Sequence, residues 1–60
     1  MAKKFVNEKT GTKTVMLECN GRYFMRYYEH FRSCGWRLVG GMEEVSKEDY
    51  DNFQEGYIAP

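Results

Sequence analysis

The sequence predicts a single small α+β domain over residues 1–56, followed by a C-terminal tail at residues 57–60. Three observations favour this fold class. An Asn-Gly pair separates two runs of strand-forming residues, which indicates a β-hairpin. Apolar residues recur at three- and four-residue steps between residues 26 and 34, which is typical of a short helix. A capping pattern at Ser46 predicts a C-terminal helix. A small five-stranded barrel is the alternative architecture.

The N-terminal half is expected to form a β-meander. A short strand at residues 5–8 leads through a turn around Gly11 to a longer strand at residues 13–19. The turn at Asn20 and Gly21 fixes the hairpin register, because both positions of a type I′ turn need positive φ. Cys19 then lies opposite Arg22. We expect the face with Val15, Leu17, Cys19 and Phe24 to be buried, and the face with Thr14, Met16, Tyr23, Met25 and Tyr27 to be partly exposed.

The central segment is predicted to be a helix over residues 26–34. Tyr27 or Tyr28, then Phe31 and Cys34, recur at helical spacing, and Gly35 suits a left-handed C-terminal cap. Tyr28 fits the preceding strand equally well. A strand at residues 36–39 follows, and the Gly40-Gly41 turn returns the chain antiparallel to it at residues 42–45. The strands at residues 5–8 and 42–45 are short enough to be loops instead.

The C-terminal helix has the clearest signals. Ser46 is the expected N-cap, and Asp49 follows three residues later as in a capping box. Val45 and Tyr50 have the spacing of a hydrophobic staple, and Gly56 is a natural stop. Tight turns predict an antiparallel sheet, and helices on one of its faces would supply most of the core.

Length and composition exclude several classes of protein. A chain of 60 residues buries only about 60% of its unfolded surface, so its stability is marginal. It also has little room for a deep cleft, because ligand pockets occupy about 300–1,000 Å³. An apolar content of 42% with 17% aromatic residues is too high for a disordered chain. The sequence has no membrane-spanning apolar run and no signal-peptide pattern, so we expect a soluble cytoplasmic protein with Cys19 and Cys34 as thiols. One disulfide between them is the alternative.

The charge is uneven although the net charge is zero. Residues 1–41 carry eight basic and three acidic groups, whereas residues 42–60 carry one basic and six acidic groups. The acidic segment either folds back onto the basic part or faces a different partner. An acidic surface of this kind also suits a basic groove on another protein.

Arginine and aromatic residues are concentrated between residues 22 and 37. These residue types are enriched in protein interfaces, so the leading hypothesis is a non-enzymatic module that binds another protein. Aromatic rings also stack on unpaired bases, so the alternative is a single-stranded nucleic-acid binder. A plain core and self-association are further interpretations. The expected protein contacts are Tyr23, Met25, Tyr27, Trp36 and Arg37, and the alternative nucleic-acid contacts are Arg22, Arg26, Tyr23 and Tyr27.

Catalytic and metal chemistry have weak signals. His30 and Cys34 would share a face of the predicted helix, but only Cys19 is an obvious third metal ligand. A nucleophilic site would also need an orienting group and oxyanion donors, and the sequence indicates neither. We therefore predict no enzyme activity, no metal and no cofactor.

One resemblance concerns the chain start and its centre. The chain has 60 residues and starts with Lys3-Lys4-Phe5. Its predicted short helix runs into the segment Gly35-Trp36-Arg37-Leu38-Val39. In these respects the protein resembles small accessory proteins encoded by phages and prophages of Gram-positive bacteria. The resemblance implies a non-enzymatic protein that binds a host or phage component.

Overall fold

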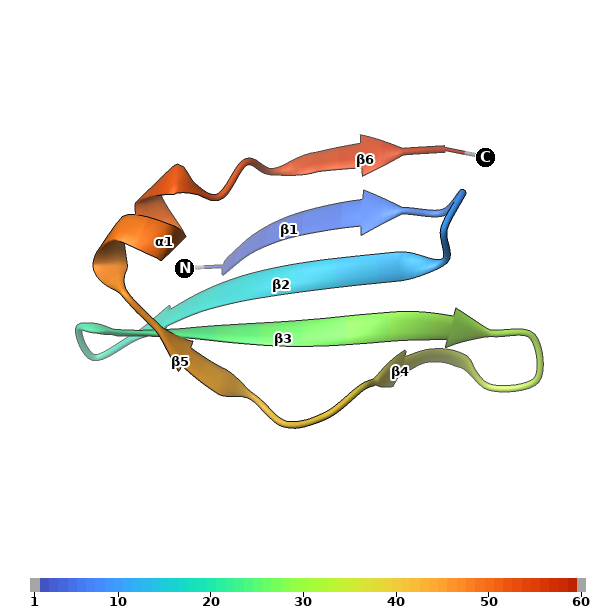
Figure 1. The fold of residues 1–60 in the computed structure, drawn as a ribbon, viewed down its shortest axis with the longest axis horizontal. Coiled ribbons are helices and arrows are strands. Elements are labelled where there is room, and N and C mark those ends of the chain that lie inside the picture. Colours follow the sequence, from blue (N-terminus) through green and yellow to red (C-terminus); the bar gives the residue numbers. More distant parts are fainter. Residues whose placement is uncertain (1, 60) are drawn as a thin grey trace.

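The computed structural model describes residues 2–59, in which six strands form one sheet and a single helix lies beside it (Figure 1). The sheet has the strand order β4-β3-β2-β1-β6, and β5 pairs with β3 outside this path. The elements are β1 (Ala2–Asn7), β2 (Thr12–Cys19), β3 (Arg22–Phe31), β4 (Gly35–Leu38), β5 (Glu43–Val45), α1 (Lys47–Asn52) and β6 (Gly56–Ile58).

The hairpin of β2 and β3 confirms the predicted turn and register. Asn20 and Gly21 have φ values of 53° and 77°, as a type I′ turn requires. Cys19 pairs with Arg22, and the ladder continues without interruption to Thr12 and Glu29. This hairpin is the centre of the sheet, with β1 on one side and both β4 and β5 on the other.

The predicted α+β fold with two helices is wrong, because the central segment is strand. Residues 26–31 continue β3, which is ten residues long. Tyr28 and Phe31 fit helical spacing, but the same segment is rich in aromatic residues, which favour strands. The positive φ of 75° at Gly35 is present, yet it serves the turn into β4 rather than a helix end. The tertiary pairing with β2 and β4 therefore outweighs the local periodicity.

The sheet is mixed and not purely antiparallel. Strand β6 runs parallel to β1, and it occupies residues expected to be a tail. Strand β5 pairs with the first half of β3, although its expected partner was the strand at residues 36–39. Strands β4 and β5 therefore extend along the same edge of β3, one at each end (Figure 1).

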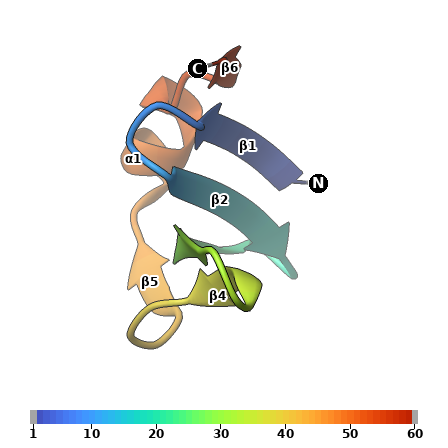
Figure 2. The ribbon, with the colours of Figure 1, turned by 90° about the vertical axis from the view of Figure 1, so that its right-hand side faces the viewer.

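The two faces of the sheet are covered unequally. Residues paired across strands lie on the same face, so the register sorts the strand residues onto two sides. Helix α1 packs on one side, and the other side has no layer formed by residues 2–59 (Figure 2). We call these the helix face and the open face. The helix face carries Lys3, Phe5, Thr14, Met16, Tyr23, Met25, Tyr27, Arg37 and Val45, and the open face carries Lys4, Val6, Lys13, Val15, Leu17, Arg22, Phe24, Arg26, Tyr28, His30, Trp36 and Glu44.

The core lies mainly on the helix face, so the predicted choice of buried face is wrong. Met16 is 6% exposed and Tyr50 of α1 is 7% exposed, whereas Val6 is the buried residue on the open face. One short helix supplies the only covering layer in residues 2–59, and that layer packs against the Met16 side. The open face is the face of Val15, Leu17, Cys19 and Phe24, which were expected to be buried.

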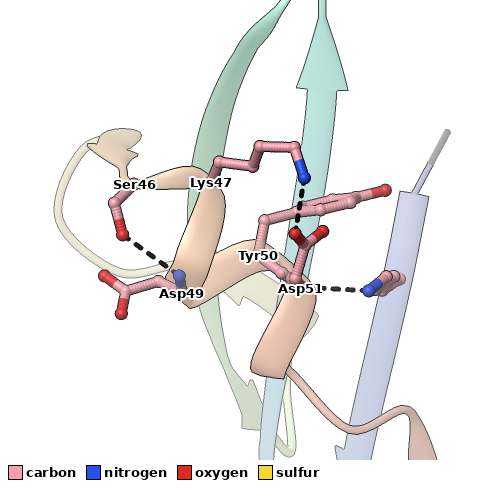
Figure 3. A network of polar contacts seen from close by, with 6 residues as sticks. Ser46, Lys47, Asp49, Tyr50 and Asp51 are labelled. Carbon is pink, nitrogen blue, oxygen red and sulfur yellow. Dashed lines mark hydrogen bonds and ion pairs between the residues drawn. The ribbon is translucent and has the colours of Figure 1, made fainter.

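Helix α1 confirms the predicted C-terminal helix and its N-cap, but Gly56 is not its stop, because the helix ends at Asn52 and Gly56 begins β6 (Figure 3). The Ser46 hydroxyl accepts a hydrogen bond of 3.0 Å from the Asp49 backbone N–H. Lys47 and Asp51 form an ion pair of 2.7 Å one turn apart. No helix within residues 2–59 has the length and apolar character needed to cross a membrane.

Candidate functional site

The open face combines aromatic rings with basic side chains at the centre of the sheet. Phe24 and Tyr28 come from β3, and Trp36 comes from β4. All three are half-buried, because neighbouring strand residues flank them and no layer of residues 2–59 lies over them. Alternation along each strand produces this set, since every second residue points to the same side.

Basic groups on the open face outnumber acidic groups. The basic strand residues are Lys4, Lys13, Arg22 and Arg26, and Glu44 is the acidic strand residue on this side. The helix face has the opposite tendency, with acidic residues at Glu18, Glu29 and Glu43 and further carboxylates in the first turn of α1. The helix face also carries Lys3 and Arg37, so the open face is the more basic of the two faces.

Cations lie directly over the rings of the open face. The Lys13 ammonium is 4.6 Å from the ring centroid of Tyr28 and 5.0 Å from that of Trp36. The Arg22 guanidinium carbon is 5.4 Å from the Phe24 centroid. These distances fit cation–π attraction, which holds the basic groups above the sheet and close to the rings.

One basic group of the open face is neutralised. Arg22 donates from Nε and Nη2 to the two Glu44 carboxylate oxygens at 3.0 and 2.8 Å. This hydrogen bonding raises the pKa of Arg22 and lowers the pKa of Glu44. Both side chains are at least half exposed, so the pair contributes little to stability, but it links β5 to β3 and occupies the guanidinium.

A hollow of about 330 Å³ lies at the end of the open face where β1 and β2 are joined by a turn. It is lined by Glu8, Gly11, His30 and Trp36. The rings of His30 and Trp36 are 5.2 Å apart and nearly perpendicular, at 74°. The Tyr57 hydroxyl donates a 2.8 Å hydrogen bond to Glu8 Oε2, and this contact raises the pKa of Tyr57.

The five expected protein-contact residues do not share one surface. Tyr23, Met25, Tyr27 and Arg37 lie on the helix face, while Trp36 lies on the open face. Tyr23 packs against the helix, with its ring centroid 4.9 Å from that of Tyr50. The set therefore divides into four residues on the helix face and one ring on the open face.

The four alternative nucleic-acid residues are also divided. Arg22 and Arg26 lie on the open face, whereas Tyr23 and Tyr27 lie on the helix face. The expected nucleic-acid set lacked Phe24, Tyr28 and Lys13, and Trp36 was expected as a protein contact only. A strand period of two continued through residue 31 would have placed Phe24 and Tyr28 with Arg26, because these β3 residues then align on one face.

His30 and Cys34 do not share a helix face, contrary to the prediction. His30 is in β3, and Cys34 is in the turn before β4. Cys34 and Cys19 are both exposed free thiols. Within residues 2–59 no three His, Cys, Asp or Glu side chains gather as a metal site would need.

Comparison with known proteins adds no relative. No family model, no curated protein and no solved structure matches this chain. The resemblance to phage accessory proteins stays a prediction, and the helix that contributed to it is strand β3.

Proposed function

We propose that the protein binds single-stranded nucleic acid on the open face of its sheet. The observation that carries this proposal is the clustering of Phe24, Tyr28 and Trp36 with basic side chains on a sheet surface that no helix or strand of residues 2–59 covers. Base–aromatic stacking supplies affinity for any sequence, and basic groups pair with the phosphates.

The contact geometry favours unpaired bases over a duplex. Tyr28 and Trp36 stand on adjacent strands, in diagonal positions of the β3–β4 ladder. A base reaches such rings only if its own face is free, which a stacked duplex does not offer. Lys13 lies over both rings through a flexible stem, so its ammonium can move to a phosphate when a base stacks.

Matched pairs of neighbouring residues test the assignment of the face. Tyr28→Leu and Arg26→Gln alter the open face, whereas Tyr27→Leu and Arg37→Gln alter the helix face. Binding of a labelled single strand of about 12 nucleotides is measured by fluorescence anisotropy. Loss of one stacking ring is expected to weaken binding by about 1–3 kcal/mol.

The expected result is weaker binding for the open-face variants alone, with all variants folded by circular dichroism. Absence of binding by the unaltered protein at about 50 mM salt would overturn the proposal, because electrostatic attraction is strong there. Equal losses for the two faces would overturn the choice of surface.

Protein binding is the second candidate, and exposed apolar side chains beside β4 favour it. Phe31, Leu38, Val39 and Met42 are 44%, 47%, 38% and 49% exposed. Three of them line a shallow hollow of about 400 Å³. Partner subunits stabilise small domains, so a second copy is the simplest occupant. Sedimentation at several concentrations measures this, and a monomer throughout would exclude self-association.

A further inference from the structure

We propose that the hollow beside Trp36 receives a guanine base of the bound strand. This inference rests on the proposed function and assigns a base preference to one place on the surface. The hollow is lined by Glu8, Gly11, His30 and Trp36, and Trp36 also belongs to the open face. A strand that stacks along the open face therefore reaches the hollow without leaving the sheet.

The walls of the hollow suit a flat aromatic ligand. The rings of His30 and Trp36 meet at 74° with centroids 5.2 Å apart, so one ring can stack on a base while the other contacts its edge. The volume of about 330 Å³ is at the lower end of the range for ligand sites. It has room for a single base.

The turn that forms the third side is fixed against β3. The backbone N–H of His30 donates a 2.8 Å hydrogen bond to the Gly11 carbonyl oxygen. Gly11 has a φ of 71°, a conformation that residues with a Cβ rarely adopt. The turn therefore brings bare backbone to the hollow, and Glu8, the first residue of the same turn, also lines it.

Glu8 supplies the carboxylate of the hollow, and its position is set from two directions. Its backbone N–H donates to the Ile58 carbonyl at 2.9 Å, and its Oε2 accepts from the Tyr57 hydroxyl at 2.8 Å. An ionised carboxylate only accepts hydrogen bonds, and it retains capacity for further donors. A base that enters the hollow must therefore present N–H groups to Glu8.

Guanine meets this requirement best among the bases. Its Watson–Crick edge has a ring N–H beside an exocyclic amino group, which gives two adjacent donors to one carboxylate. In cytosine and adenine the amino group stands beside a ring nitrogen that is an acceptor. In thymine and uracil the ring N–H lies between two carbonyl oxygens, which a carboxylate repels. Charge-assisted hydrogen bonds of this kind are stronger than neutral ones.

The test compares four labelled oligonucleotides that differ at one central base. The background is an oligothymidine of about 12 nucleotides, and the central position is thymine, guanine, adenine or cytosine. Affinities are measured by fluorescence anisotropy for the unaltered protein, for Glu8→Gln and for Glu48→Gln. Glu48 lies in α1, so its variant removes the same charge far from the hollow.

The guanine oligonucleotide is expected to bind about tenfold more tightly than the other three. Glu8→Gln should bring all four to similar affinities, because an amide presents an acceptor and a donor where guanine needs two acceptors. Glu48→Gln should retain the guanine preference. Circular dichroism spectra and melting curves of the two variants establish that both are folded.

The outcomes separate this inference from the proposed function. If no oligonucleotide binds, the proposed function fails and the inference fails with it. If the strands bind with equal affinity, or if another base is preferred, the inference is overturned while the open face remains a nucleic-acid surface. A guanine preference that survives Glu8→Gln also overturns it.

Discussion

The ring of Tyr50 lies against the ring of Tyr23, with centroids 4.9 Å apart and planes inclined at 43°. This contact joins α1 to β3 and sets which face of the sheet is covered. Lys3 of β1 completes the arrangement, since its Nζ donates to the Tyr50 carbonyl at 2.9 Å and lies 4.4 Å from the ring centroid. Burial raises the pKa of Tyr50, as expected for a phenol in this position.

Two adjacent residues of β2 test the assignment of the faces. Met16 is buried on the helix face, and Leu17 is half-buried on the open face. Met16→Ala should lower the free energy of unfolding by about 2–5 kcal/mol, because it leaves a cavity under α1. Leu17→Ala should cost clearly less. Urea denaturation measures both, and a larger loss for Leu17→Ala would contradict the assignment.

The hairpin could be predicted from sequence because its information is local. Asn20 and Gly21 specify a turn with positive φ, and the turn alone fixes which residues face each other. The N-cap at Ser46 is local in the same sense, since its hydroxyl bonds to a backbone N–H three residues later.

The buried face could not be predicted in this way, because tertiary packing decides it. Both faces of β2 and β3 carry apolar residues, and only the position of Tyr50 shows which side is covered. The helix predicted at residues 26–34 was wrong for the same reason, because the spacing of its aromatic residues fits both a helical and a strand period. The candidate site depends on which face is covered and on whether residues 26–31 are strand, so its residues were only partly predicted.

The turn between β2 and β3 allows a second stability prediction. Gly21 has a φ of 77°, and a Cβ added there would meet no atom within 4 Å. Gly21→Ala should therefore destabilise the protein by about 1–2 kcal/mol through backbone conformation alone. Gly41→Ala is the matched control, because its surroundings are equally open and its φ lies outside the left-handed region. Equal midpoints of urea denaturation for the two variants would refute the conformational argument.

The cap of α1 gives a third prediction. Ser46→Ala removes the acceptor for the Asp49 backbone N–H and should lower stability by about 1 kcal/mol. Ser46→Asp keeps an acceptor at the same place and should restore most of the loss. Thermal denaturation followed by circular dichroism compares the three proteins. If Ser46→Asp is no more stable than Ser46→Ala, the hydroxyl contact does not stabilise the helix.

The Tyr57–Glu8 contact predicts a shifted titration at high pH. The hydrogen bond raises the pKa of Tyr57 above its ordinary value, which is about 10. Its contribution to stability is therefore complete below the unfolded-state pKa and is lost as pH rises through the folded-state pKa. Glu8→Gln should lower the Tyr57 pKa toward the ordinary value. Residue-resolved NMR titration is needed, because Tyr50 also titrates high; an unchanged Tyr57 pKa would contradict the contact.

The Arg22–Glu44 pair predicts how salt affects nucleic-acid binding. The slope of log K against log salt is about −0.7 per neutralised phosphate for single strands, so Lys4, Lys13 and Arg26 together predict about −2. Arg22 is engaged by both carboxylate oxygens of Glu44 and contributes little in the unaltered protein.

Release of that arginine should strengthen binding and make it more sensitive to salt. Glu44→Gln removes the charge that holds the guanidinium, so the slope should steepen by about 0.7 and affinity should rise most at low salt. Glu48→Gln changes the net charge equally but lies in α1, and its slope should match that of the unaltered protein. Anisotropy titrations at several salt concentrations measure the slopes. If the two variants have the same slope, Arg22 does not reach a phosphate. If the slope of the unaltered protein is near zero, the site has no electrostatic basis.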